Sequence, residues 1–251
     1  MVRIEPDPEG DYRRRRAQPR RRRRGRWRWL LLGFLATTIT PILVFSVVNP
    51  PLSMCMIIAW FDARLHQRAD FRVHYTWVNA AANSDDLALA VIAAEDQRFA
   101  MHAGFDFKQI RAALGNGVEG RELRGASTLS QQVAKNLLLW PGRSWLRKGI
   151  EAWFTFWIER CWSKRRILEV YLNIAQFGNG IYGARAASQI FLHKNPAALT
   201  RREAALLAAV LPNPLELHIA NPSPRVLQRR GWIEQQMTRL GGRRYLQQIG
   251  W

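Results

Sequence analysis

Cysteine is nearly absent from this 251-residue chain, in which Cys55 and Cys161 are the only two. Two cysteines cannot form a disulfide framework, and neither has the spacing of a metal ligand. We therefore predict two small, buried apolar residues rather than a disulfide bridge, and no metal site in the protein.

Alternating runs of apolar and polar residues are scarce, and no internal repeat is present. These absences exclude a large sheet and a repeat protein, so we predict a mainly α-helical fold with at most a minor sheet. Thr200-Arg201-Arg202-Glu203 is typical of a capping box, Pro212 ends the helix that follows, and Gly241-Gly242 ends the last helix. From residue 83 onward the predicted helices are 85–97, 106–115, 128–139, 144–161, 164–175, 181–192, 201–211 and 224–239.

Apolar residues and acids are both rare in residues 1–28, which hold twelve arginines against four acids. Such a segment cannot bury enough apolar surface to fold alone. Residues 29–48 then carry no charge, and about 20 such residues can cross a bilayer as a helix. A cleavable signal peptide would need a small-residue cleavage site, which Asn49-Pro50-Pro51 does not offer. We predict a cytoplasmic Arg-rich tail (1–28), a transmembrane helix (29–48), a juxtamembrane segment (49–70) and a folded domain (71–251).

The arginines before the span predict its orientation, because positive charge stays on the cytoplasmic side. The protein would then cross the cytoplasmic (inner) membrane once and hold its folded domain in the periplasm. The tail carries +8 of the net charge of +19, which leaves +11 for the remainder. This excess indicates an anionic ligand or a lipid surface, and the topology excludes nucleic acid. Residues 52–65, with Trp60 and Phe61, either lie in the membrane interface or form the first core-facing helix.

Two adjacent carboxylates, Glu95 and Asp96, end an apolar helix that Ser84 caps. Because little polar surface precedes Glu95, we predict a partly desolvated carboxylate whose pKa rises toward the range in which a general base works. The alternative is an ordinary helix C-terminus at which the two acids pair with Arg98 and Lys108.

A second group of polar residues begins at a helix start, where residues 125–128 are small or carry hydroxyls. Gln131 with Lys135, and Gln132 with Asn136, are i, i+4 pairs on neighbouring faces. A helix N-terminus followed by a lysine suits a phosphate group. The alternative is an ordinary capped helix with a polar face.

A third group follows Arg143, where Arg147 and Lys148 lie within one helical turn of Glu151. The alternative is a surface ion-pair ladder, which contributes little to stability. The same helix carries four large apolar residues: Ile150, Trp153, Phe154 and Trp157. We therefore predict a largely buried helix, in which charges without a function would be costly.

Taken together, these motifs resemble the glycosyltransferase domain of peptidoglycan synthases, which class A penicillin-binding proteins share. The resemblance runs in order from around residue 60 to the end of the chain. It is greatest to the monofunctional biosynthetic peptidoglycan transglycosylases, since too few residues remain for a penicillin-binding domain. The residues that carry it are Glu95-Asp96-Gln97-Arg98-Phe99 with His102 and Gly104; Gly125-Ala126-Ser127-Thr128 with Gln131-Gln132 and Lys135-Asn136; Arg147-Lys148 with Glu151; Lys164 with Ile167-Leu168-Glu169 and Tyr171-Leu172-Asn173; and Glu203-Ala204-Ala205-Leu206-Leu207 with Leu211-Pro212-Asn213-Pro214.

The resemblance implies a lysozyme-like, mainly helical fold that polymerises lipid II, a disaccharide-pentapeptide on undecaprenyl pyrophosphate, for cell-wall biogenesis. Glu95 would be the general base that takes the proton from the 4-hydroxyl of the acceptor sugar as it attacks the donor's anomeric carbon, with inversion. Lys135 and Arg143, helped by Arg147 and Lys148, would neutralise the pyrophosphate leaving group, which is usually the largest catalytic effect.

The remaining residues of the predicted site have other roles in this interpretation. Glu151 would orient the cations or coordinate an ion near the diphosphate, and Gln132 would contact the substrate. Structural support is expected from four residues: Asp96, Arg98, Phe99 and His102. No obligatory cofactor is expected, and a divalent cation near the diphosphate is optional. The expected partners are lipid II, the growing glycan chain, membrane lipids and other proteins of cell-wall synthesis.

Two other functions stay open at this point. A lysozyme-like hydrolase or lytic transglycosylase also uses one catalytic Glu, but it requires neither several cations near a second Glu nor a membrane anchor. A membrane-tethered module could bind lipid pyrophosphate without turnover, but it would gain nothing from a carboxylate such as Glu95 aimed at its ligand.

Overall fold

The structure is a computed structural model that describes residues 21–118, 127–142 and 144–251. The chain divides into two units, Met1–Pro41 and Ile42–Trp251. Most of the first unit's described part is helix α1, which spans Arg21–Val47. Within the described ranges, its Trp27–Val47 portion is the one helix long and apolar enough to cross a membrane, with a hydropathy of 2.2.

Helix α1 begins at Arg21 rather than at residue 29, where we predicted the span to begin. Arginine is a good helix former, and a helix already nucleated by the apolar residues extends at little cost. The hydroxyls of Thr37 and Thr38 donate to the carbonyls of Gly33 and Phe34 at 2.9 and 2.8 Å. These two polar side chains are therefore satisfied within the helix itself.

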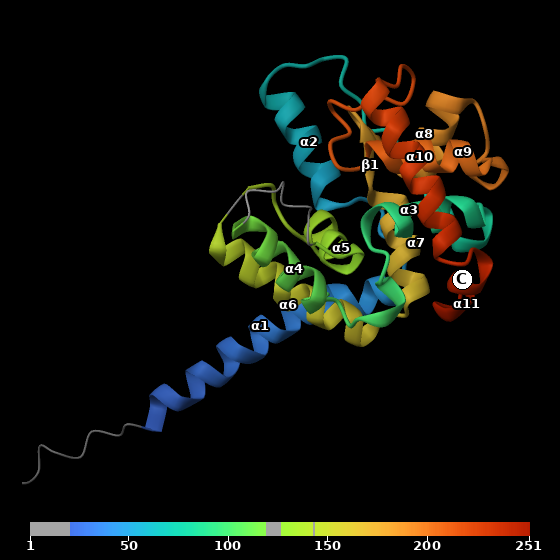
Figure 1. Ribbon diagram of the computed structural model, residues 1–251. Coiled ribbons are helices and arrows are strands. Elements are labelled where there is room, and N and C mark those ends of the chain that lie inside the picture. Colours follow the sequence, from blue (N-terminus) through green and yellow to red (C-terminus); the bar gives the residue numbers. More distant parts are fainter. Residues whose placement is uncertain (1–20, 119–126, 143) are drawn as a thin grey trace, which may run out of the picture. The chain divides into compact units, whose positions relative to one another are not determined.

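Helices also build the second unit, which Figure 1 shows as two packing groups around α3 and α5. Helix α3 packs against α9, α10 and α11, whereas α5 packs against α2, α6 and α7. The elements are α2 (Met54–Leu65), α3 (Asp85–Glu95), α4 (Phe107–Val118), α5 (Leu129–Leu138), α6 (Trp145–Cys161), α7 (Lys164–Ile174), β1 (Gln176–Gly178), β2 (Ile181–Tyr182), α8 (Ala184–Leu192), α9 (Arg201–Val210), α10 (Pro224–Arg239) and α11 (Arg243–Gln248), with 3-10 turns at Ala80–Ala82, Phe99–Met101 and Pro196–Ala198. The predicted mainly helical fold with one long apolar N-terminal helix is confirmed.

Helix α3 forms the centre of its group because its sequence is apolar on every side. All seven residues from Leu87 to Ala93 are at most 2% exposed. Ser84 caps the helix as predicted, with its hydroxyl accepting from the Leu87 amide at 3.0 Å. The predicted capping box of Thr200 and Glu203 is also present at the start of α9. The core thus holds α3 on all sides and leaves its C-terminal residue, Glu95, at the edge.

Two elements differ from the predictions. Strands β1 and β2 form a short antiparallel hairpin, and β2 takes the first residues of the predicted helix 181–192, so α8 begins only at Ala184. Gly183 lies at the bend between β2 and α8, and only glycine fits there, because φ is +82° and a Cβ would lie 2.5 Å from the Asn173 carbonyl oxygen. Gly241-Gly242 ends α10 as expected, but the short helix α11 follows, so α10 is not the last helix.

Residues 42–49 are bonded to the start of α7. The Trp162 indole donates to the Ile42 carbonyl at 2.7 Å. The Arg166 guanidinium donates to the carbonyls of Phe45 (3.1 Å) and Val48 (2.8 Å) and to the Asn49 side chain (2.9 Å). One arginine therefore satisfies carbonyls that the end of α1 leaves without helical partners.

Both cysteines are free thiols, so the prediction that they form no bridge is confirmed. The predicted burial is only partial, because Cys55 and Cys161 are half-buried and pack against the core. Helix α2, which holds Cys55, is the core-facing helix of the two alternatives for residues 52–65, and its place in a membrane interface stays a prediction. Its Met56 side faces the core, while Trp60 and Phe61 are 42% and 56% exposed.

Candidate active site

Glu95 is the last residue of α3, and its side chain is only 13% exposed. One carboxylate oxygen, Oε2, accepts a hydrogen bond from the Gln132 amide of α5 at 2.9 Å. The other, Oε1, lies 3.4 Å from the guanidinium of Arg229 on α10. The alternative pairing with Arg98 is wrong, because Arg98 pairs with Asp106 instead.

The surroundings of Glu95 set its protonation. Burial raises the pKa of this carboxyl above its ordinary value, as predicted. The hydrogen bond from Gln132 opposes the rise, followed by the positive charges of Arg229 and Lys135, while the neighbouring Asp96 adds to it. A raised pKa makes this carboxylate a stronger proton acceptor than an ordinary one, while the cations nearby favour its ionised form.

Gln132 is itself oriented by a tyrosine from α7. The hydroxyl of Tyr171 donates to Gln132 Oε1 at 3.1 Å, which leaves the amide nitrogen to donate to Glu95. Burial, and next the charge of Glu95, raise the pKa of Tyr171 well above its ordinary value, so the hydroxyl keeps its proton. Three helices therefore meet at one carboxylate.

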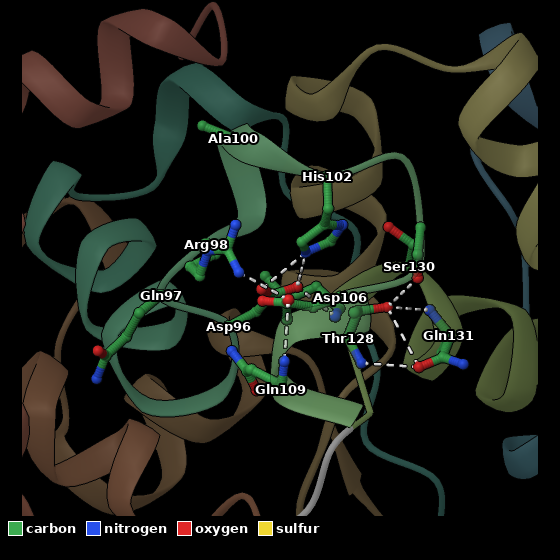
Figure 2. A network of polar contacts seen from close by, with 12 residues as sticks. Asp96, Gln97, Arg98, Ala100, His102, Asp106, Gln109, Thr128, Ser130 and Gln131 are labelled. Carbon is green, nitrogen blue, oxygen red and sulfur yellow. Dashed lines mark hydrogen bonds and ion pairs between the residues drawn. The ribbon is translucent and has the colours of Figure 1, made fainter. Parts of the chain in front are cut away.

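Asp96, the next residue, joins the end of α3 to the start of α5. Its side chain is 2% exposed in total and accepts from His102 Nε2 at 2.9 and 3.0 Å and from the Leu129 amide at 3.0 Å. Figure 2 shows His102 beside Asp96, with Thr128 and Gln131 of the helix start nearby. Since Leu129 begins α5, the Asp96 carboxylate fixes the helix that carries Gln132 and Lys135.

The other residues expected to give structural support lie around this junction. Phe99 is fully buried, and Lys164 lies 4.5 Å from its ring centre. The Lys164 ammonium also donates to the His102 carbonyl at 2.6 Å and pairs with Glu159 at 2.8 Å. Arg98 contacts Asp106 at 2.9 Å, and Asp106 in turn accepts amides at the start of α4. The four residues expected to give structural support all lie within the segment that joins α3 to α5.

The third group of predicted site residues lies on α6. Glu151 is 3% exposed and pairs with Arg147 at 3.2 Å and with Lys148 at 2.5 Å, the two ion pairs that the spacing predicts. Glu151 is thus buried against its own helix, while Glu95 contacts α5 and α10. Helix α5 packs on α6, and it also carries Gln132, which binds Glu95.

Of two further predicted cations, Lys135 lies within the described residues and Arg143 does not. Lys135 is exposed on α5 and acts on Glu95 through its charge. Arg143, like the Gly125-Ala126 part of the motif, lies outside the described residues.

Our prediction that α6 is largely buried is wrong, since the side chains it buries are Glu151, Thr155 and Ile158. The four large apolar residues of the prediction are half-buried.

Several large apolar side chains on α4, α6 and the segment between α5 and α6 are exposed. Trp145 is 93% exposed, Leu146 74%, Phe107 74%, Phe156 54% and Trp140 48%. Exposed apolar side chains of this size are candidates for contact with another apolar phase.

Two residues of the site were not found from the sequence. Tyr171 was noted only as part of a motif, without a role. Arg229 lies on a predicted helix among other arginines, and nothing in the local pattern distinguishes it. Its contact with Glu95 joins residues 134 positions apart.

Comparison with known proteins assigns this chain to a family. The transglycosylase family model matches residues 62–238, which is most of the chain. The chain belongs to this family. It is 49% identical over 217 residues to the biosynthetic peptidoglycan transglycosylase of Xylella fastidiosa, covering 86% of this chain and 89% of that protein. It is 51% identical over 208 residues to the proteins of that name from Shigella boydii and Escherichia coli, covering 82% of this chain and 86% of each relative.

The described residues contain no group of three or more His, Cys, Asp or Glu that could hold a metal ion. Both oxygens of Glu151 are engaged by cations, Oε2 by Arg147 and Oε1 by Lys148. Glu151 therefore fits the orientation of cations better than the coordination of a metal.

Proposed function

We propose that this transglycosylase polymerises lipid II into glycan strands, with inversion at the anomeric carbon and release of undecaprenyl diphosphate. Its family makes it a peptidoglycan glycosyltransferase of cell-wall synthesis. The observation that carries the finer proposal is Glu95, a buried carboxylate that two helices hold from either side, with a lysine of α5 close enough to act on its charge.

The proposed reaction uses Glu95 as the general base. The 4-hydroxyl of the acceptor sugar gives its proton to the Glu95 carboxylate while its oxygen forms a bond to the donor's anomeric carbon. The bond between that carbon and the pyrophosphate oxygen breaks, and the electron pair leaves with the pyrophosphate. Attack opposite to the leaving group inverts the configuration. A pyrophosphate leaves without strong protonation, so His102 is not needed as an acid and is assigned to support.

The leaving group requires positive charge. Lys135, Arg147 and Lys148 would neutralise the developing negative charge on the diphosphate, as would Arg143. Preorganised charges of this kind usually supply the largest part of a rate enhancement. The two ion pairs of Glu151 support this role, because they hold Arg147 and Lys148 in place before substrate binds. If a divalent cation takes part, the diphosphate oxygens would have to hold it, and no step depends on it.

The membrane is the second part of the proposal. We propose that α1 anchors the protein once in the cytoplasmic membrane, with the N-terminus inside and the enzyme in the periplasm, since twelve arginines precede the apolar residues. The exposed apolar side chains Trp145, Leu146, Phe107, Phe156 and Trp140, and Trp60 and Phe61 of α2, support contact with lipid beside the substrate's own membrane. Contacts with other proteins of cell-wall synthesis stay a prediction.

The activity is tested by supplying lipid II to the purified full-length protein in detergent and digesting the product with lysozyme. Wild type should form a polymer that lysozyme degrades. Glu95→Gln should lose on the order of 100-fold to 10,000-fold in rate while keeping its fold, because the amide cannot accept the proton. The matched control is Glu234→Gln, which changes a carboxylate of α10 that pairs with Arg230. Wild-type turnover by Glu95→Gln would exclude Glu95 as the base, and shortening of added glycan would identify a hydrolase.

The orientation is tested separately by fusing reporters to the last residue, Trp251. Alkaline phosphatase should be active there, and a fluorescent protein that matures only in the cytoplasm should stay dark. The opposite pair of results would overturn both the orientation and the access to lipid II.

A further inference from the structure

Arg229 lies between the Glu95 carboxylate and a pocket in the surface. Its Nη2 group contacts Glu95 Oε1 at 3.4 Å and the Ala94 carbonyl at 3.5 Å. The same side chain lines a pocket of about 330 Å³ between the end of α9 and the first half of α10, together with Arg225 and Trp232. The guanidinium side chain is 28% exposed, so it is partly desolvated without being sealed off.

The two oxygens of Glu95 are held by different elements. Arg229 of α10 binds Oε1, and Gln132 of α5 binds Oε2. With both oxygens held, the plane of the carboxylate is fixed, and its remaining lone pairs have defined directions. A base must lie within hydrogen-bond reach of the proton it accepts, so orientation of this kind bears directly on the rate.

The charged groups that face Glu95 come from several helices. Lys135 of α5 and Arg229 of α10 favour the ionised form, while its neighbour Asp96 opposes it, and the hydroxyl of Tyr171 on α7 lies behind Gln132. The arginines that pair with the other end of α3 are Arg201 of α9, 4.0 Å from Asp86, and Arg243 of α11, 2.8 Å from Asp85.

The two cations near Glu95 differ in their availability during the reaction. Lys135 is exposed, and in the proposed function it neutralises the diphosphate. Once its charge is compensated by phosphate oxygens, it supports the ionised carboxylate less. Arg229 contacts the carboxylate directly from the opposite helix, so its charge remains with Glu95 when the substrate is bound.

We propose that Arg229 is a positioning residue that keeps the Glu95 carboxylate ionised and oriented for proton transfer, a role that rests on the proposed function of Glu95 as the base. The guanidinium does not touch the reacting atoms in this scheme. It acts through the carboxylate, and its loss should therefore change how the rate depends on pH and not only the maximal rate.

The test is the pH–rate profile of lipid II polymerisation by the full-length protein in detergent. Arg229→Gln should move the acid limb of the profile to higher pH, because without the guanidinium the buried carboxylate takes up its proton more readily. On the acid limb, where a displacement by one pH unit lowers the rate tenfold, we expect Arg229→Gln to lose a factor of about ten. At high pH its rate should recover to within about threefold of wild type. The acid limb of Arg229→Lys should lie between those of wild type and Arg229→Gln, because lysine keeps the positive charge but lacks the planar guanidinium group.

The control is Arg225→Gln, one helical turn earlier on α10 and in the wall of the same pocket. It removes a charge of the same sign and should leave the acid limb in place. An acid limb of Arg229→Gln that coincides with wild type would overturn the proposal, as would an equal displacement in Arg225→Gln. If Arg229→Gln does not fold by circular dichroism, Arg229→Lys decides: a displaced limb supports the proposal, and a wild-type profile overturns it.

Glu95→Gln in the same series separates this inference from the proposed function. If Glu95→Gln polymerises at the wild-type rate, the assignment of the base fails. If Glu95→Gln is inactive while Arg229→Gln keeps the wild-type limb, the base stands and only the role of Arg229 fails.

Discussion

Asp96→Asn should destabilise the protein far more than the change of one atom suggests. The Asp96 carboxylate accepts from the Leu129 amide through Oδ2 and from His102 Nε2 through both oxygens. A carboxylate only accepts hydrogen bonds, so His102 Nε2 must carry the proton, which leaves Nδ1 without one unless the ring is charged. His102 Nδ1 is buried and has no hydrogen-bond partner.

Asparagine offers one acceptor in place of two. If its oxygen accepts from Leu129, its amide nitrogen faces the Nε2 proton of His102, and two donors oppose each other. If His102 moves its proton to Nδ1, that donor is buried without an acceptor. Either arrangement costs about 1–3 kcal/mol, and the loss of charge from two charge-assisted bonds adds about 1 kcal/mol, so we expect about 2–4 kcal/mol less free energy of unfolding.

The assay is chemical denaturation of the full-length protein in detergent, followed by circular dichroism. The control is Asp106→Asn, an aspartate that is also 2% exposed. Its three donors, Arg98 and the amides of Lys108 and Gln109, all bond to Oδ1, which asparagine keeps. We expect a smaller loss of about 1–3 kcal/mol there, because the pair with Arg98 weakens and the asparagine NH2 replaces Oδ2, which is buried without a hydrogen-bond partner. Equal denaturation midpoints for Asp96→Asn and wild type, or a larger loss in Asp106→Asn, would refute the reasoning.

Four further changes test other parts of the structure. Burial raises the pKa of Glu95, so the folded state holds this proton to higher pH than the unfolded chain, and stability falls as pH rises from the unfolded to the folded pKa. Glu95→Gln should therefore melt higher than wild type at about pH 8 and lose this gain as the pH falls, and a gain independent of pH would contradict the shift. Gly104→Ala should lower the free energy of unfolding by more than about 1 kcal/mol, because φ is +86° and a Cβ would lie 2.8 Å from Thr155 Cγ2. Gly149→Ala on α6, whose Cβ would meet nothing within 4 Å, should raise the free energy of unfolding by roughly 0.5–1 kcal/mol in the same denaturation assay. Tyr171→Phe removes the hydroxyl that orients Gln132, so polymerisation should slow while stability falls by only about 1 kcal/mol, and an unchanged rate would show that Gln132 needs no such orientation.

The parts of the fold that the sequence predicted are those decided locally. An apolar run with Ser84 at its start predicts α3 and places Glu95 at its end, because capping and burial act within one helix. The spacing of Arg147, Lys148 and Glu151 predicts both ion pairs for the same reason. Strands β1 and β2 were missed because three and two residues are too few to show a period.

The parts of the site that were missed depend on contacts between distant segments. Asp96 bonds to Leu129 and Glu95 to Arg229 only because the fold brings the start of α5 and the middle of α10 to the C-terminal end of α3. The partial exposure of α6 is a further example. Large apolar residues predict burial when water is the only solvent considered, whereas a protein beside a bilayer can leave them outside its own core.

The bonds from Trp162 and Arg166 to residues 42–49 have a mechanical consequence. A force along the backbone of α1 is transmitted to Trp162, just before α7, and to Arg166 in its first turn. These two side chains bind the carbonyls of Ile42, Phe45 and Val48. Helix α7 carries Tyr171, whose hydroxyl holds Gln132 on Glu95. The end of α1 is thus joined to Glu95 through Arg166, helix α7, Tyr171 and Gln132, and no loop lies on this path to absorb strain.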